Sequence, residues 1–97
     1  MLHADELTLI KEATSRGMFD TTTETTRAVF CEVRSIGMNE AYTAMSLGIH
    51  PELVFVLSDY AEYDGEKLVE YKNVRYRVVR TYVSKERIEL VCERVIG

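Results

Sequence analysis

The 47 residues from 51 to 97 constrain the fold most, because they consist of short extended segments separated by turn signals. The apolar run LVFVLS, residues 53–58, predicts a strand that is covered on both faces. In the last hairpin, apolar residues alternate with arginine and glutamate, which is typical of an antiparallel pair with one buried face. Strands are predicted at 53–58, 68–71, 74–83 and 87–95, with turns near Asp64-Gly65, Lys72-Asn73 and Ser84-Lys85. Such a sheet, in so short a chain, is expected to close on itself.

Two further strands are predicted before residue 37. In residues 4–12 and in residues 25–36, successive side chains fall on alternate faces of the segment, as they do in a strand. Between them, residues 13–23 lose the alternation and contain a glycine, an aspartate and several threonines. We interpret this segment as a long hairpin loop whose tip carries Met18 and Phe19.

One short helix is predicted over residues 40–47. Asn39 is a suitable N-cap, and Gly48 can end a helix in the left-handed conformation. A helix of about two turns needs packing to persist. Its expected buried stripe comprises Ala41, Met45 and one or both of Tyr42 and Leu47.

These elements make a single domain, residues 1–97, of mainly β class. The expected fold is a small antiparallel β-barrel or sandwich of about six strands, with one short helix and a long hairpin loop. No helical apolar run approaches the roughly 20 residues that cross a bilayer, and Asp5 and Glu6 interrupt the N-terminal apolar residues, unlike a signal peptide. We therefore expect a soluble cytoplasmic protein that does not engage a membrane.

The formal net charge of −4 is unevenly distributed along the chain. Residues 1–58 carry four basic and eight acidic groups, and residues 59–70 carry five acidic groups against Lys67. Residues 71–97 carry seven basic and three acidic groups. The overall acidity counts against a nucleic-acid binder. Opposite charges on different surfaces suit head-to-tail docking between copies, although the same charges also suit pairs across strands.

Few residues are candidates for catalysis. Cys31, His50 and Asp59 are of the types found in nucleophilic sites, but they equally fit a core strand, a connection and a turn. Cys31 and Cys92 lie in apolar strand patterns, so we expect buried free thiols rather than a disulfide or a zinc site. Phosphate-loop, dinucleotide and zincin motifs are absent from the sequence. A non-enzymatic protein without a cofactor or metal is therefore expected.

Two other groups of side chains need an explanation. The acidic residues between 59 and 66 lack the spacing of a calcium loop, and we expect a solvated turn there. The residues concerned are Asp59, Glu62, Asp64 and Glu66. Five tyrosines lie in the last forty residues, and we expect three of them in the half-buried sheet and the others available to an interface. The tyrosines are Tyr60, Tyr63, Tyr71, Tyr76 and Tyr82.

The sequence resembles the head-closure or head-tail adaptor proteins of long-tailed phages and prophages. The resemblance rests on CEVRSIGMNEAYTAMSLGIHPELVFVL (residues 31–57), YDGEKLVEYKNVRYRVVRTY (63–82) and IELVCERV (88–95). It extends over roughly residues 4–96, and it is the order and spacing of these segments, rather than any single one, that is specific.

This resemblance implies a β-barrel-like fold and a structural role. Family members form a ring beneath the portal and its adaptor after DNA packaging, help to retain the genome, and present a platform for the tail. The implied partners are the portal–adaptor ring, tail-terminator or tail proteins, and further copies of the chain on that template. The implied location is the host cytoplasm during assembly and then the neck of the virion.

Loops of such rings reach toward the channel or the neighbouring ring, and the two candidates here are residues 13–23 and 37–51. Contact with packaged DNA in the channel is compatible with this arrangement, but the loop 13–23 contains Asp20 as well as Arg16, so its charge does not support gripping DNA. The candidate interface or lumen residues are Arg16, Met18, Phe19, Asp20, Met38, Asn39, Tyr42 and His50. The candidate charged docking surface comprises Glu62, Asp64, Glu66, Arg75, Arg77 and Arg80.

The alternative is a small β-barrel binding module for a peptide or single-stranded nucleic acid. Its binding face would consist of Arg75, Arg77 and Arg80 with the neighbouring tyrosines. Pairing of these arginines with Glu89 and Glu93 across strands would neutralise much of that face.

Overall fold

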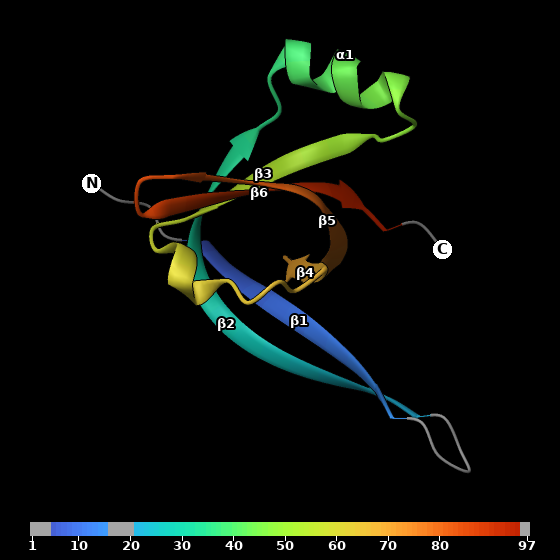
Figure 1. Ribbon diagram of the computed structural model, residues 1–97, viewed down its shortest axis with the longest axis vertical. Coiled ribbons are helices and arrows are strands. Elements are labelled where there is room, and N and C mark those ends of the chain that lie inside the picture. The colour runs from blue at the N-terminus through green and yellow to red at the C-terminus, as the bar shows by residue number, and fades with distance from the viewer. Residues whose placement is uncertain (1–4, 16–20, 96–97) are drawn as a thin grey trace.

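The computed structural model describes residues 5–15 and 21–95, which form a closed antiparallel barrel of six strands (Figure 1). The strands are β1 (Asp5–Ser15), β2 (Thr21–Ser35), β3 (Pro51–Leu57), β4 (Leu68–Tyr71), β5 (Val74–Ser84) and β6 (Arg87–Arg94). Their order around the barrel is β1-β2-β3-β6-β5-β4, and β4 pairs back onto β1. The predicted mainly β class and its six strands are confirmed, and of the two architectures the barrel is the one formed.

The interior of the barrel follows from the alternation along the strands. Leu7 and Leu9 point inward from β1, and Phe55 lies at the centre, fully buried. The Phe55 ring packs against Tyr71 and Tyr76, with ring centroids 5.3 Å and 5.6 Å apart. Such tilted and edge-on contacts add to the burial of apolar area. The other buried members of this cluster are Val29, Cys31, Leu57, Val69, Ile88, Leu90 and Cys92.

Strand β3 is buried on both faces, as predicted for an unbroken apolar run. Phe55 and Leu57 face the interior, while Val54 and Val56 pack with Val91 of β6 on the outside of the barrel. A small second cluster therefore lies on the outer face, with Ile36 and Val79 at its edge.

The turns form where the sequence predicts them. Lys72 and Asn73 both have positive φ, 50° and 65°, as a two-residue hairpin turn of the primed type requires. Gly65 has φ 76°, a conformation that suits glycine. Asp59 caps a short 3₁₀ turn, Tyr60–Glu62, by accepting a hydrogen bond from the Ala61 N–H at 2.9 Å.

The helix α1 (Met38–Ser46) begins two residues earlier than predicted. Gly37, in an extended conformation, is its N-cap, and Asn39 lies inside the first turn, so the predicted cap is wrong. Gly48 follows the helix with φ 78°, and its N–H donates to the Met45 carbonyl at 3.0 Å. The predicted role of this glycine at the helix end is confirmed.

The predicted loop over residues 13–23 is wrong at both of its ends. Residues 13–15 continue β1 and residues 21–23 begin β2, with Ala13 opposite Thr23 and Ser15 opposite Thr21. Threonine favours extended backbone even where neither face is buried, which explains why a polar run forms strands. The tip residues Arg16, Met18, Phe19 and Asp20 lie outside the described residues.

We expect Phe55→Ala to destabilise the protein by about 3–5 kcal/mol, because it leaves a cavity between Tyr71 and Tyr76 at the centre of the barrel. Equilibrium unfolding in denaturant measures this change. Phe30→Ala is the matched control, since Phe30 is 66% exposed on the outer face of β2 and should change stability by less than about 0.5 kcal/mol. Equal losses in both variants would contradict the observed core.

Candidate functional site

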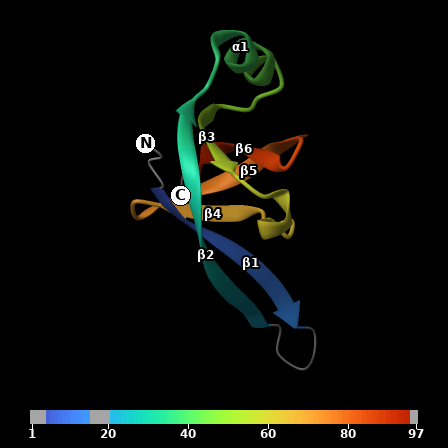
Figure 2. The same cartoon turned by 90° about the vertical axis from the view of Figure 1, so that its left-hand side faces the viewer.

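Two structures project from opposite sides of the barrel (Figures 1 and 2). One is an arm formed by residues 11–15 of β1 and 21–25 of β2. The other is the segment 37–50, which carries α1. They account for the elongated dimensions of the molecule, 48 × 34 × 25 Å. The two candidate loops, residues 13–23 and 37–51, therefore belong to two projections that point away from each other.

The arm is a two-stranded ribbon with both faces in solvent. Its residues 11–14 and 21–25 are all exposed. In the described part of the chain, no third strand pairs with either outer edge of this ribbon. A lone ribbon is marginally stable, so its direction has to be fixed by contacts with the barrel.

One such contact lies on the outer face of the barrel. The guanidinium of Arg75, on β5, donates two hydrogen bonds of 2.9 Å to the carboxylate of Glu24 on the arm. This hydrogen bonding lowers the pKa of Glu24. Bidentate arginine–carboxylate pairs fix orientation as well as distance, so this pair ties the arm to β5.

A second contact involves the loop of residues 59–67, which crosses between β3 and β4. Lys11 of β1 binds Asp64 with Nζ and Oδ2 2.6 Å apart. Arg27 of β2 binds Glu66 at 2.9 Å and also donates to the carbonyl of Glu62. The loop is thus tied to both strands near the base of the arm.

Glu66 is the most unusual charged residue of the described chain, because only 4% of it is exposed. The expectation of a fully solvated acidic turn is therefore wrong at this position. Its carboxylate accepts from Arg27 and from the Asp64 N–H at 2.7 Å, and its carbonyl accepts from the Tyr63 hydroxyl. Burial alone would raise the pKa of Glu66, but the hydrogen bonds from Arg27 and Asp64 outweigh it and lower the pKa.

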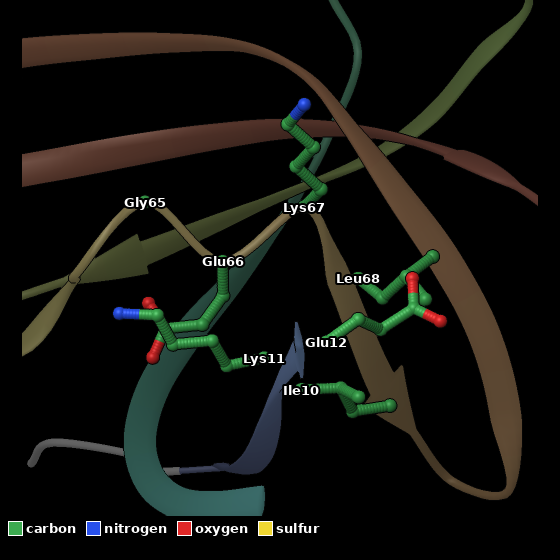
Figure 3. A pocket seen from close by; sticks show the side chains of 7 residues that line it. All are labelled: Ile10, Lys11, Glu12, Gly65, Glu66, Lys67 and Leu68. Carbon is green, nitrogen blue, oxygen red and sulfur yellow. The ribbon is translucent and has the colours of Figure 1, made fainter. Parts of the chain in front are cut away.

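A cavity of about 310 Å³ lies where β1 and β4 separate (Figure 3). Pairing between the two strands ends at Ile10 and Leu68, and the space beyond is lined by Lys11, Glu12, Gly65, Glu66 and Lys67 as well. In Figure 3 the side chains of Lys11 and Glu66 extend toward each other at one end of the cavity. Lys11 already binds Asp64, and Glu66 binds Arg27, so these two charges serve the loop. The cavity forms because β1 and β4 pair over only three residues, and it presents no convergent set of reactive groups.

The helix α1 turns its large apolar side chains outward. Met38, Tyr42 and Met45 are 74%, 66% and 53% exposed, and their spacing of four and three residues places them on one face. The half-buried residues Glu40, Ala41 and Ala44 form the other face. The predicted buried stripe is therefore wrong for Tyr42, Met45 and Leu47, and α1 contains no buried residue.

The three arginines of the predicted docking surface each have an acidic partner within the chain. Arg75 binds Glu24, Arg77 binds Glu93 at 3.2 Å, and Arg80 binds Glu40 of α1 at 3.6 Å. Asp64 and Glu66 are likewise paired, while Glu62 contributes its carbonyl. The six residues do not form one surface: the acidic ones lie on the loop beside the arm, and the basic ones are spread along β5 from the arm to α1.

The hypothetical nucleophilic site does not assemble. His50 and Asp59 lie at opposite ends of β3, whose seven residues span about 23 Å. Cys31 and Cys92 are buried free thiols, as predicted, and burial raises their pKa values to about 11 and about 12. Across residues 5–15 and 21–95, no three His, Cys, Asp or Glu side chains are grouped as metal ligands would be. No helix in the described chain is both long and apolar enough to cross a membrane.

Three of the five tyrosines pack against the core, two of them from the sheet as predicted and Tyr63 from the loop of residues 59–67. Tyr63, Tyr71 and Tyr76 contact the core, whereas Tyr60 and Tyr82 are 51% and 55% exposed. The Tyr60 N–H donates to the carbonyl of Glu86, which holds the 3₁₀ turn against the turn between β5 and β6. His50, also exposed, uses its backbone N–H to bind Glu93 at 3.3 Å.

A comparison with protein-family models finds no match for this chain, and a search of curated proteins finds none either.

The residues that position the arm were not identified from the sequence. Glu24 stands alone in a run of threonines, and its partner Arg75 is 51 residues away. Arg27 and Glu66 are 39 residues apart. The only sequence signal for such pairs is that isolated charges in a strand pattern need partners, and it does not identify which ones.

We expect Glu66→Gln to destabilise the protein by about 1–3 kcal/mol at neutral pH, because it weakens a buried, charge-assisted contact with Arg27. The pKa of Glu66 is lowered by folding, so its contribution is present above about pH 5 and is lost as the pH falls through the folded-state pKa. The stability difference between the two proteins should therefore shrink in acid.

Denaturant unfolding at several pH values measures this difference. Glu62→Gln is the matched control from the same loop, because Glu62 meets Arg27 through its backbone carbonyl. A difference between wild type and Glu66→Gln that stays constant down to strongly acidic pH would contradict the assigned ion pair.

Proposed function

We propose that this chain is a non-enzymatic structural protein of a phage virion, which forms a ring at the head-tail interface. The ring closes the portal channel after DNA packaging and provides the platform on which the tail docks. Its partners are the portal–adaptor ring on one side, tail-terminator or tail proteins on the other, and neighbouring copies of the chain. It assembles in the host cytoplasm and resides in the neck of the virion, where its projections can contact packaged DNA.

The observation that most supports this proposal is the pair of projections on opposite sides of one rigid barrel. A subunit between two other assemblies needs separate contact surfaces that it can use at the same time. The arm and the α1 segment meet this requirement, and the ion pairs of Arg75 and Arg80 connect both of them to the same strand, β5. The resemblance of residues 31–57, 63–82 and 88–95 to head-closure proteins supplies the biological setting.

The alternative, a binding module for single-stranded nucleic acid, has weaker support. A strand-binding groove combines free cations with stacking aromatic rings. Arg75, Arg77 and Arg80 are each paired with glutamate, and Tyr71 and Tyr76 pack against Phe55 in the core. Salt-dependent binding of the purified protein to an oligonucleotide would favour this alternative over the structural role.

The purified chain is expected to be monomeric or weakly associating, and to form a ring only on a portal–adaptor complex. The barrel has its own core, and its charges are largely paired, so it does not require a permanent partner. Sedimentation with and without the portal–adaptor complex of the same phage measures this. A stable large ring of the purified chain alone, or no binding to the complex, would contradict the proposal. Portal, capsid and tail genes beside the coding gene would support it independently.

Removal of the end of the arm is expected to abolish assembly without unfolding the barrel. Glu12 and Glu24 lie directly opposite each other, so residues 13–23 can be replaced by an Asn-Gly turn that joins them. This variant keeps the Lys11–Asp64 and Arg75–Glu24 contacts, and its stability should change by no more than about 1 kcal/mol. Denaturant unfolding and co-sedimentation with the portal–adaptor complex are the two measurements. An unfolded variant would show that the arm belongs to the core, and unimpaired assembly would show that it is not a contact surface.

A further inference from the structure

The arm has a strand edge with no neighbour in the described part of the chain. β1 pairs with β4 only from Thr8 to Ile10, so no described strand lies beside the outer edge of residues 11–15. Just before β4, the chain bends away from β1, because the carbonyl of Lys67 accepts a hydrogen bond from the Val78 N–H of β5 at 2.8 Å. We call the position beside residues 11–15, which a longer β4 would occupy, the open lane.

The edge along the open lane lacks the features that usually prevent a further strand from pairing. Edge strands are commonly protected by a bulge, a proline or a lysine. The register of β1 with β2 is unbroken from Asp5 to Ser15, and residues 11–15 contain no proline. Lys11 is their one lysine, and it is held by Asp64. The edge can therefore form main-chain hydrogen bonds with another extended segment.

The cavity of Figure 3 provides space at the base of the open lane. Its volume is about 310 Å³, and it begins directly beyond the last pair of β1 with β4, Ile10 with Leu68. These two residues supply its apolar side chains, and charged side chains line the rest. Since β4 occupies the lane from Leu68 onward, a segment antiparallel to β1 has to end or turn outward in this cavity.

The charge beside the open lane comes from two glutamates. Glu12 of β1 lies directly opposite Glu24 of β2, and like charges in this position repel. Arg75 donates two hydrogen bonds to Glu24, whereas Glu12 has no hydrogen bond or ion pair with another described residue. Figure 3 shows the Glu12 side chain beside Leu68, at the end of the cavity away from Lys11. A carboxylate that the described chain leaves unpaired therefore lies at the lane.

We propose that the outer edge of residues 11–15 is a strand-addition site for an extended, basic segment of another protein. The segment runs antiparallel to β1, which continues the direction of β4 and is slightly more stable than parallel pairing. A lysine or arginine opposite Glu12 supplies the cation that the pair of Glu12 and Glu24 lacks. Main-chain hydrogen bonds provide the affinity of such a contact, and side chains provide its specificity.

The charge of the arm argues against a second copy of the chain as the occupant. The described residues of the arm, 11–15 and 21–25, contain Lys11 as their one cation, and Asp64 already binds it. The arm of a second copy would therefore bring no free cation to Glu12, whereas a basic segment of a different protein would. The inference rests on the arm being a contact surface, as in the proposed function, but it does not depend on the phage role.

Peptides of defined sequence test the site on the full chain. The probe is a blocked pentapeptide, acetyl-Thr-Val-Thr-Lys-Thr-amide, whose lysine lies opposite Glu12 when its last residue enters the cavity. A second peptide has glutamate in place of the lysine, and a third has proline in place of the central threonine. NMR titration of the isotope-labelled protein measures the affinity for each peptide and identifies the amides that respond.

We expect the lysine peptide to shift the amides of residues 11–15 and to bind roughly fivefold more tightly than the glutamate peptide, because opposite charges replace like charges across the strands. The proline peptide should bind more weakly than either, since proline has no N–H to donate to a ladder.

Charge reversal within the chain provides the matched pair of variants. Glu12→Lys should invert the preference, so that the glutamate peptide binds more tightly. Glu6→Lys makes the same change on the same face of β1 but outside the open lane, and it should keep the preference of the wild type. Both glutamates are exposed, so the unfolding midpoints of the two variants should stay close to that of the wild type.

Three results would overturn the inference. Amide shifts outside the arm, or none at millimolar peptide, would show that the lane does not take a strand. An unchanged preference for the lysine peptide in Glu12→Lys would show that Glu12 does not select the segment. Shifts of residues 11–15 that depend on protein concentration in the absence of peptide would show that a second copy occupies the lane.

The inference and the proposed function fail separately. The expected peptide binding, without binding of the chain to the portal–adaptor complex, would retain the strand-addition site and contradict the phage role. Assembly on that complex by a chain that binds none of the peptides would do the reverse.

Discussion

The geometry of this protein depends on the seam that closes its barrel. β1 pairs with β2 over eleven residues but with β4 over three, from Thr8 opposite Glu70 to Ile10 opposite Leu68. Three pairs suffice because Leu9 and Val69 at the seam are fully buried beside the aromatic cluster around Phe55. Since β1 is released from β4 after Ile10, it continues outward with β2 as the arm, and the cavity of Figure 3 opens in the angle. The length of the seam therefore determines where the barrel ends and the arm begins.

Ion pairs then connect the parts that leave the barrel to its strands. Exposed pairs contribute little to stability, with a median of about 0–1 kcal/mol, but a bidentate pair such as Arg75–Glu24 restricts orientation. The basic excess after residue 71 is largely used in this way, because Arg75, Arg77 and Arg80 each meet a glutamate from another part of the chain. The charges of Arg75, Arg77 and Arg80 are thus paired within the molecule.

The sequence predicted those features that depend on near neighbours along the chain. Alternation placed the strands, and Asp64-Gly65 and Lys72-Asn73 placed two turns, because positive φ is a local requirement. The errors concern contacts between residues that are distant along the chain. The pattern of α1 indicated which face is apolar but not whether anything covers it. Met45 was wrongly assigned to a buried stripe, and neither Tyr42 nor Leu47, the alternatives for its other position, is buried. The threonine run could not be recognised as strand, since alternation reports a strand only when one face is buried. The burial of Glu66 depends on Arg27, 39 residues earlier, a pairing that no local pattern encodes.

The exposed helix stripe is better understood as a consequence of assembly than as a defect of packing. If Met38, Tyr42 and Met45 faced the barrel, the chain would gain roughly 1.5–3 kcal/mol for each side chain buried. That gain is forgone in the isolated subunit, and an apolar surface of this size on a small domain usually marks a contact.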